Sequence, residues 1–598
     1  MGRVTPEACP GAPRANQTFR SCLIVSGVMG VLALNSVGAF HSALDSNETY
    51  VVVNTLKIAA TNSLEPSPFL AYGTVFPYLL VSIYGAMYLG GVALGTYDDP
   101  ADFGLQFFIE PLPLYVAGRL VSAASATGTV CIVYLIGRDV FHSRAVGVLA
   151  GLFVLLDKVH FLRAQAVLPD ATLSFFCTLF VYVTLKILHE KRIRYYVLAG
   201  IAAGLAIGTK ANGAVVLTGI AVAHLLANKD EAWKSVFDRE ALAFSASLIT
   251  ALFVAHPFFF LKFEEVIGLI FQEADKAQYV LKGEGYAPYL WIGKTFVSDN
   301  RLVGVMYLLG TLYALIRGIR GDRPALTLFA IIASYVAVFG PNKIQNIHFL
   351  LPIVPALALM AADLALALYR MRDHRAWKAA TICVICAMSL PSASSVEAMI
   401  VYRAQPTSQE LATRWVESHI PKDKLIALDS YEDGPQMFTL NRYFESGRLQ
   451  DYRDFVPERV RRKLEDYAKR HGAYVTCRIK YYHEEPQWPA QFTQQQIVRF
   501  TGDRFMEREY RLDWRNLEQL RTMGVRYIIT STASSWNEKR LYPPDHLLYF
   551  AHQKKVAFYE SLTEANGVIP LVMFGHIRIF LLVFEEQDRA DIVGGDAS

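Results

Sequence analysis

The chain has 598 residues, of which 53% are hydrophobic and only 19% are charged. Soluble proteins carry charge on about a quarter of their residues, so this composition excludes a wholly soluble protein. The net charge of +4 is too small to indicate a nucleic-acid partner. Apolar residues form long runs up to about residue 395, and the remainder reads as an ordinary soluble domain.

Eleven apolar runs predict membrane-spanning helices, each of which needs about 17–25 mainly apolar residues. The predicted crossings are 23–43, 113–137, 145–159, 169–187, 195–209, 211–227, 241–261, 302–317, 325–340, 348–369 and 377–394. The fold class is therefore a multi-pass α-helical membrane protein with about 11 transmembrane helices. Membrane lipid is its expected surrounding.

The connecting loops are of two alternating kinds. The basic loops are 138–144, 186–194, 229–239, 317–323 and 370–378, and by the positive-inside rule they are cytoplasmic. The loops between them, 44–112, 160–168, 209–212, 262–301 and 341–347, should face outside. An inside N-terminus followed by eleven crossings places the C-terminus outside. A plasma or inner membrane is the expected location.

One further apolar run, residues 69–95, is long enough to span. A single crossing there would place every later basic loop outside. We therefore interpret it as an interfacial or re-entrant segment that is covered by protein. The alternative is that it spans and that a short run elsewhere does not.

The last third of the chain has the pattern of an α/β domain. Helical periods occur at 409–420, 464–469 and 514–523, and strands are predicted at 424–428, 473–477, 525–530 and 577–584. The predicted organisation is a cytoplasmic tail (1–22), a transmembrane domain (23–398) that includes the outer loop 44–112, and an extracytoplasmic α/β domain (399–598).

Three carboxylates fall at the predicted outer face. Asp45 and Glu48 follow the first crossing, and Asp170 opens the helix 169–187. A carboxylate in this place can act as a general base toward an incoming hydroxyl. Loop acids are more often merely solvated, and Asp170 after Pro169 could simply cap its helix. If a helix begins near residue 45, the three-residue spacing puts Asp45 and Glu48 on one face.

Four basic or titratable residues fall at the same face: Arg163, Lys210, Lys343 and His348. A lysine at a membrane edge is costly and indicates a functional site, although snorkelling is the ordinary alternative. Each residue alone is a weak signal, and a histidine such as His348 is often just an interfacial polar group. Together, acids and cations at a lipid–water boundary suit group transfer from a phosphate-bearing lipid.

A set of motifs resembles the GT-C type, polyprenyl-phosphate-dependent glycosyltransferases of the protein-mannosyltransferase and aminoarabinose-transferase-like superfamily. The resemblance covers about residues 20–400 and depends on the order and spacing of the motifs. They are Leu64–Pro66, Tyr72–Leu79, Gly118–Ala123, Tyr134–Arg138, Arg163 with Leu168–Asp170, Gly208–Lys210, His256 and Phe349–Pro352.

The resemblance implies transfer of a sugar from a polyprenyl-phosphate donor to a lipid, glycan or protein acceptor outside the membrane. It assigns the donor phosphate to Arg163, Lys210, Lys343 and His348, and catalysis to Asp45, Glu48 and Asp170. No cofactor is indicated, but a divalent cation bound at the outer-loop carboxylates is an open alternative.

Two positions depart from the family pattern: one is in the first outer loop, and the other is His348, where relatives often carry Arg before the Leu-Leu-Pro. The family usually has adjacent Asp-Glu in the first outer loop, whereas this chain has Asn47-Glu48, with Asp45 two residues earlier. Asp45 is the predicted base, because the family uses an aspartate, and Glu48 is its predicted partner. The alternatives are that Glu48 is the base, that the chain is a non-catalytic donor-binding relative, or that it is a transporter. Paired internal repeats, which many transporters show, are not evident.

Overall fold

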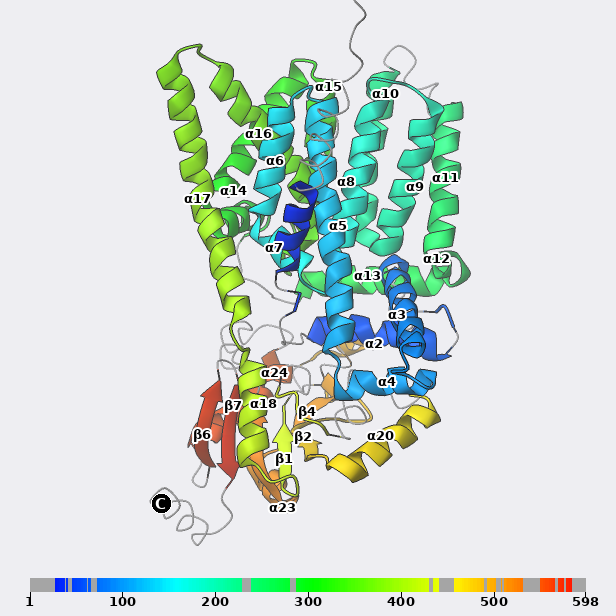
Figure 1. Cartoon of the computed structure of the whole chain (residues 1–598), viewed down its shortest axis with the longest axis vertical. Coiled ribbons are helices and arrows are strands. Elements are labelled where there is room, and N and C mark those ends of the chain that lie inside the picture. The colour runs from blue at the N-terminus through cyan, green and yellow to red at the C-terminus, as the bar shows by residue number, and fades with distance from the viewer. Residues whose placement is uncertain are drawn as a thin grey trace, which may run out of the picture.

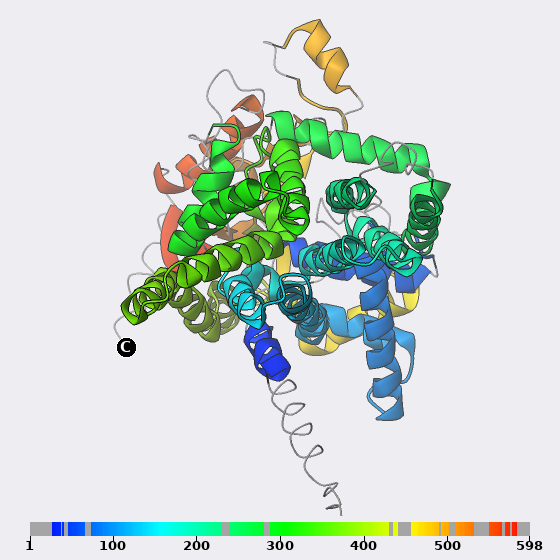
Figure 2. The same cartoon turned by 90° about the horizontal axis from the view of Figure 1, so that it is seen from above.

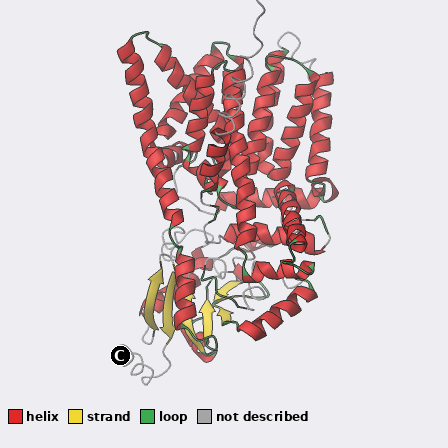
Figure 3. Cartoon of the chain, in the orientation of Figure 1, coloured by secondary structure: helices red, strands yellow, loops and turns green. Residues whose placement is uncertain are grey.

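A computed structural model describes most of the chain. The described residues are 27–37, 39–40, 46–61, 63–65, 73–228, 238–279, 287–429, 434–439, 456–488, 492–501, 507, 510–530, 549–564, 568–574 and 577–582. A long helical bundle occupies one half of the molecule, and a smaller region with a β-sheet adjoins one end of it (Figures 1 and 3).

The bundle consists of apolar helices that bury a shared core. Tyr307, Tyr335 and Leu359 are fully buried in it. The bundle elements are Gly27–Ser36, α5 (Leu112–Asp139), α6 (Arg144–Leu155), α7 (Lys158–Ala164), α8 (Asp170–Ile187), α9 (Ile193–Thr209), η2 (Ala211–Val216), α10 (Leu217–Ala227), α11 (Arg239–Ala255), α14 (Leu290–Ile319), α15 (Arg323–Phe339), η5 (Ile347–Ile353), α16 (Val354–Arg370) and α17 (Arg375–Ala404). The helices α12 (Phe258–Leu261) and α13 (Phe263–Tyr279) follow α11, and α13 runs across the lower end of the bundle in Figure 1.

The two ends of the bundle differ as predicted. The turns after α5, α8, α14 and α16 carry basic residues and lie at one end, here called the basic end (Figure 1). The opposite end, here called the domain end, faces α2 (Ser46–Thr61), α3 (Val75–Ala93), α4 (Pro100–Ile109) and the sheet region (Figure 1). The two kinds of loop are therefore separated in space.

Six of the described helices are long and apolar enough to cross a bilayer, or seven if the bent pair α6–α7 is one span. Four shorter apolar helices are also present, at Gly27–Ser36, Ile193–Thr209, Ala211–Ala227 and Arg323–Phe339. The chain is thus an integral membrane protein. The number of eleven crossings stays a prediction.

Helix α3 falls within the run 69–95 that was interpreted as interfacial. It is 19 residues long and apolar, so length and composition alone qualify it as a span. Its direction differs from that of the bundle, because it is seen nearly end-on in Figure 1 and lengthwise in Figure 2. It therefore lies across the domain end rather than alongside the long helices, which favours the interfacial interpretation.

Two predicted boundaries correspond to breaks in helices. The crossing predicted at 145–159 is shorter, because the chain bends by 70° between α6 and α7, and α7 occupies part of the predicted loop 160–168. Asp157 caps α7 and also accepts a hydrogen bond from Asn300 Nδ2 at 2.7 Å. The neighbouring Arg301 has a φ of 50° and interrupts α14 one residue before the predicted start at 302.

The C-terminal region is α/β, as its pattern predicts. Its elements are α18 (Ser408–His419), β1 (Leu425–Leu428), α20 (Glu458–His471), β2 (Val475–Arg478), β3 (Lys480–Tyr482), α21 (Gln494–Phe500), β4 (Leu512–Trp514), α23 (Leu517–Thr522), β5 (Val525–Thr530), α24 (Tyr549–Glu564), β6 (Val568–Phe574) and β7 (Ile577–Leu582). The antiparallel pair of β3 and β4, the strand β6 and the helices α21 and α24 were not predicted.

The main sheet has the strand order β2-β1-β5-β7-β6. Strand β1 pairs in parallel with β2 and β5, and β7 pairs antiparallel with β5 and β6. Alternate residues of β5 enter two apolar cores: Ile528 packs with residues of α23 and α24, and Ile529 with residues of α18. The sheet is thus covered on both faces, which is typical of strands with near-continuous apolar runs.

Helix α20 connects this region to the domain end of the bundle. It packs against α4, and Lys463 Nζ lies 3.1 Å from Asp99 Oδ2 and 2.6 Å from Asp102 Oδ1. Asp99 caps α4, and the lysine lowers the pKa of both carboxyl groups. These contacts hold α20 directly against α4, so that side chains of the two helices pack together.

Candidate active site

Asp170 is the centre of a buried charge cluster at the domain end. Pro169 precedes it and ends the loop from α7, so that Asp170 becomes the first residue of α8. Its side chain is 5% exposed, and Oδ1 lies 2.9 Å from Lys210 Nζ. Arg163 NH1 lies 3.7 Å from Oδ2. A helix N-terminus also favours a negative charge, so the carboxylate is held by two cations and a helix dipole.

Lys210 reaches this cluster because the chain is extended where α9 ends. Its φ of −163° and ψ of 136° separate α9 from η2 and direct the chain back along α8. The side chain is 13% exposed, and its ammonium lies 5.6 Å from the centre of the Phe349 ring. His348, next to Phe349 in the chain, interacts electrostatically with Asp170. Four of the residues predicted from sequence therefore come together.

A cavity of about 330 Å³ lies beside this cluster. Arg163 and His348 form part of its wall, together with the ion pair of Lys158 and Asp299, whose Nζ and Oδ1 are 2.8 Å apart. Its remaining lining includes the polar side chains of Thr295, Ser298, Gln345 and Asn346. The wall thus has three basic side chains, one carboxylate and several hydrogen-bonding groups, a composition that is suited to an anion.

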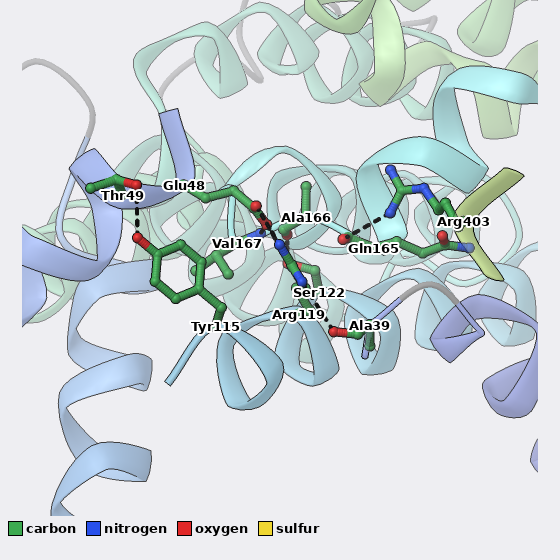
Figure 4. Close-up of polar contacts among 10 residues, drawn as sticks. All are labelled: Ala39, Glu48, Thr49, Tyr115, Arg119, Ser122, Gln165, Ala166, Val167 and Arg403. Carbon is green, nitrogen blue, oxygen red and sulfur yellow. Dashed lines mark hydrogen bonds and ion pairs between the residues drawn. The ribbon is translucent and has the colours of Figure 1, made fainter. Parts of the chain in front are cut away.

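Glu48 lies in a second buried cluster, shown in Figure 4. Both of its carboxylate oxygens accept hydrogen bonds from Arg119, from Nε to Oε1 at 2.9 Å and from NH2 to Oε2 at 2.7 Å. The backbone N–H of Val167 also donates to Oε1 at 2.8 Å. Glu48 is 3% exposed and Arg119 is fully buried. This bidentate pair fixes α2 to α5 and to the loop before α8.

Further contacts in Figure 4 hold the same loop. Ser122 Oγ donates to the carbonyl of Ala166 at 2.6 Å, and Arg403 donates to the carbonyl of Gln165 at 3.5 Å. Tyr115 donates to Thr49 at 2.7 Å, next to Glu48. The loop before α8, which leads to Asp170, is therefore held by α2, α5 and α17.

Some predicted residues do not join these clusters. Asp45 lies outside the described residues, directly before α2. Asn47 is exposed. Lys343 is exposed on the loop before η5 and is not part of the cavity wall. The structure therefore brings Arg163, Lys210 and His348 together with Asp170, but does not place Lys343 there.

His160 also departs from its expected position in an outer loop. It is 1% exposed within α7, and within the described part of the chain neither ring nitrogen has a hydrogen-bond partner. It does not line the cavity. The described residues contain no group of three or more His, Cys, Asp or Glu side chains that could hold a metal ion. Because Asp45 is not among them, a divalent cation at the outer-loop carboxylates stays a prediction.

Sequence reasoning missed the partners that complete both clusters. Lys158 and Asp299 were not identified, because each is an ordinary charged residue near a predicted loop and their pairing joins α7 to α14. Arg119 belongs to the motif Gly118–Ala123, but no role was predicted for it. The spacing of 71 residues between it and Glu48 gave no signal for their pairing.

Comparisons with known proteins support the resemblance seen in the motifs. Residues 82–267 match the model of the dolichyl-phosphate-mannose-protein mannosyltransferase family. The match includes Arg119, Arg163, Asp170 and Lys210, and it confirms the predicted resemblance for this part of the chain. No curated protein matches the chain.

The chain is also similar to several solved membrane-enzyme structures. ArnT from Cupriavidus metallidurans bound to undecaprenyl phosphate is 14% identical, with a TM-score of 0.48 over 94% of this chain and 98% of that chain. The oligosaccharyltransferase from Archaeoglobus fulgidus is 11% identical, with a TM-score of 0.46 over 93% of this chain and 88% of that chain. The arabinosyltransferase EmbB from Mycobacterium smegmatis is 17% identical, with a TM-score of 0.36 over 62% of this chain and 32% of that chain.

Proposed function

Residues 82–267 match the model of the mannosyltransferase family, and we therefore propose that the chain is a glycosyltransferase. It transfers a sugar from a polyprenyl-phosphate donor to a hydroxyl acceptor at the domain end. The observation that carries this proposal is the convergence of Arg163, Lys210 and His348 around Asp170, beside a cavity suited to an anion. Arg163 and Lys210 come from two predicted loops and His348 is the first residue of a predicted crossing, and all three lie within or next to the family motifs.

The charge balance of the cluster fits a departing lipid phosphate. With His348 neutral, Arg163 and Lys210 exceed the charge of Asp170 by one positive charge. The sugar-linked phosphate is a diester with a single negative charge, whereas the released monoester carries about −1.5 to −2 at pH 7. The cations therefore stabilise the leaving group more strongly than the bound donor. Such a difference lowers the barrier of the chemical step.

The acceptor hydroxyl needs a base on the face opposite the phosphate. Glu48 already accepts hydrogen bonds from Arg119 and from the Val167 N–H, so it is suited to hold the segment that precedes α2. Asp45 belongs to that segment and is the proposed base. In this assignment Glu48 is a positioning residue and Asp45 takes the proton from the hydroxyl as the sugar–phosphate bond breaks.

We expect Asp45→Asn to lower transfer by about 10²–10⁴-fold, because this is the usual effect of removing a general base. The measurement is transfer of labelled sugar from a polyprenyl-phosphate sugar by the full chain in proteoliposomes. Asn47→Asp, which restores the family's residue, is the matched control and should retain activity. Full activity of Asp45→Asn, with an inactive but stably folded Glu48→Gln variant, would reverse the assignment.

The side of the membrane is part of the proposal. The basic end carries the loops that the positive-inside rule assigns to the cytoplasm, so the site and the α/β region should face outside. In intact cells, a membrane-impermeant thiol reagent should label Glu518→Cys but not Glu190→Cys. Labelling of Glu190→Cys but not of Glu518→Cys would contradict this orientation.

A further inference from the structure

A second cavity lies between α2, α3, α4 and α20, and has a volume of about 480 Å³. Its wall is mostly apolar and includes Leu56, Val81, Phe103, Phe107 and Val460. This volume is within the range of cavities that hold small ligands. Because α20 supplies part of the wall, the cavity exists only where the C-terminal region packs on the bundle end.

The cavity and the Glu48 cluster share helix α2. Its wall includes Val53 and Leu56 of α2, and Glu48 lies at the first turn of the same helix. With a rise of 1.5 Å per residue, Leu56 is about 12 Å along the helix from Glu48. Tyr84 also lines the cavity, donates to the carbonyl of Leu114 at 3.0 Å and interacts electrostatically with Glu48.

The cavity is separate from the anion cavity, with which it shares no residue. The anion cavity is formed by α7, α14 and the segment leading into η5, whereas this one is formed by α2, α3, α4 and α20. The Glu48 cluster contacts both sets of elements, since Glu48 belongs to α2 and Val167 follows α7. Two ligands held on these two sides would meet near the start of α2.

Helix α3 gives the cavity a connection to lipid. Its outward side chains Leu79, Leu89 and Val92 are exposed and apolar, and it lies across the domain end of the bundle (Figures 1 and 2). Exposed apolar side chains of this kind can contact membrane lipid. Because α3 also supplies Val81, Gly85 and Tyr88 to the cavity wall, an apolar chain could pass from the bilayer to the cavity.

From these features we propose that the cavity holds an acyl chain of a lipid acceptor, whose hydroxyl then lies at the start of α2. The inference rests on the proposed function and names the acceptor class. The donor's phosphate is assigned to the other side of Glu48, and displacement at the sugar requires the acceptor to approach opposite the leaving phosphate. The apolar wall suits a hydrocarbon chain, and Asp99 and Arg459 supply charged groups among its lining residues.

A filled cavity provides a direct test. A Cβ added at Gly85 meets no atom within 4 Å, so Gly85→Phe should occupy the cavity without disturbing the backbone. Gly90 lies on the same helix, is equally open and does not line the cavity, so Gly90→Phe is the matched control. The probe is a diacylglycerol with a diazirine in one acyl chain, in phosphatidylcholine vesicles that contain the full chain.

We expect the probe to label peptides of α2–α4 on irradiation, and we expect Gly85→Phe to reduce this labelling at least about tenfold while Gly90→Phe does not. Unchanged labelling in Gly85→Phe, or no labelling of wild type, overturns the proposal. Labelling by a diazirine-bearing polyprenyl phosphate instead would assign the cavity to the donor and also overturn it. Binding of polyprenyl phosphate that depends on Lys210 reports separately on the proposed function, whichever result the acyl probe gives.

Discussion

Replacing Lys210 by alanine should lower sugar transfer by about 10²–10³-fold, the usual effect of removing one group that stabilises developing charge in a buried site. The ammonium lies 2.9 Å from Asp170 and is 13% exposed, so little solvent screens its interactions. Without it, the charge of Asp170 is balanced by Arg163 at 3.7 Å. The site then loses its excess positive charge. The measurement is the rate of transfer at matched protein concentration.

A structural effect of this substitution can be separated from its effect on the donor. Lys210→Ala leaves Asp170 less well paired, which alone could destabilise the bundle. The double variant Lys210→Ala with Asp170→Asn removes both charges, so it should regain thermal stability but not transfer. Lys191→Ala, at the basic end, is the control and should behave as wild type. Recovery of transfer in the double variant would show that Lys210 only balances Asp170.

Replacing Arg119 by alanine should give the largest loss of stability. Arg119 is fully buried and makes two hydrogen bonds to Glu48, so its removal leaves a buried carboxylate without its guanidinium. Removing one partner of such a pair typically lowers the free energy of unfolding by about 3–5 kcal/mol. Glu48 also accepts from the Val167 N–H, so the loop before α8 should loosen as well. Thermal unfolding of the purified chain in detergent measures the loss.

The pair can be tested by removing both charges. Arg119→Met with Glu48→Leu should be more stable than Arg119→Met alone, because no buried charge is left unpaired. The double variant should still lack transfer activity, since Glu48 no longer positions the segment before α2. If Arg119→Met alone unfolds at the wild-type temperature, the pair does not hold α2 in the folded protein.

The sequence predicted the features that follow from local pattern. The alternation of basic and other loops gave the two ends of the bundle, and the helical and strand periods gave α18, β1, β2, β5 and β7 with ends close to those observed. The loop residues Arg163, Asp170, Lys210 and His348 were identified because charges at membrane edges are costly and therefore noticeable.

The pairings could not be predicted, because they join residues far apart in the chain. Asp170 was predicted to act in catalysis alongside the acids of the outer loop, but its described partners are the cations Lys210 and Arg163. The bend between α6 and α7 depends on Asp157 accepting from Asn300, 143 residues later. The acyl-chain cavity requires α20 to pack on α4, which no period in either segment indicates.

We propose that the cluster around Asp170 holds the phosphate of a polyprenyl lipid. The most direct measurement is equilibrium binding of polyprenyl phosphate to the purified full chain, compared with polyprenol, which lacks the phosphate. We expect wild type to bind the phosphate-bearing lipid at least about tenfold more tightly than the alcohol, and we expect Lys210→Ala to abolish this difference. Equal binding of the two lipids by wild type, or an unchanged preference in Lys210→Ala, would contradict it.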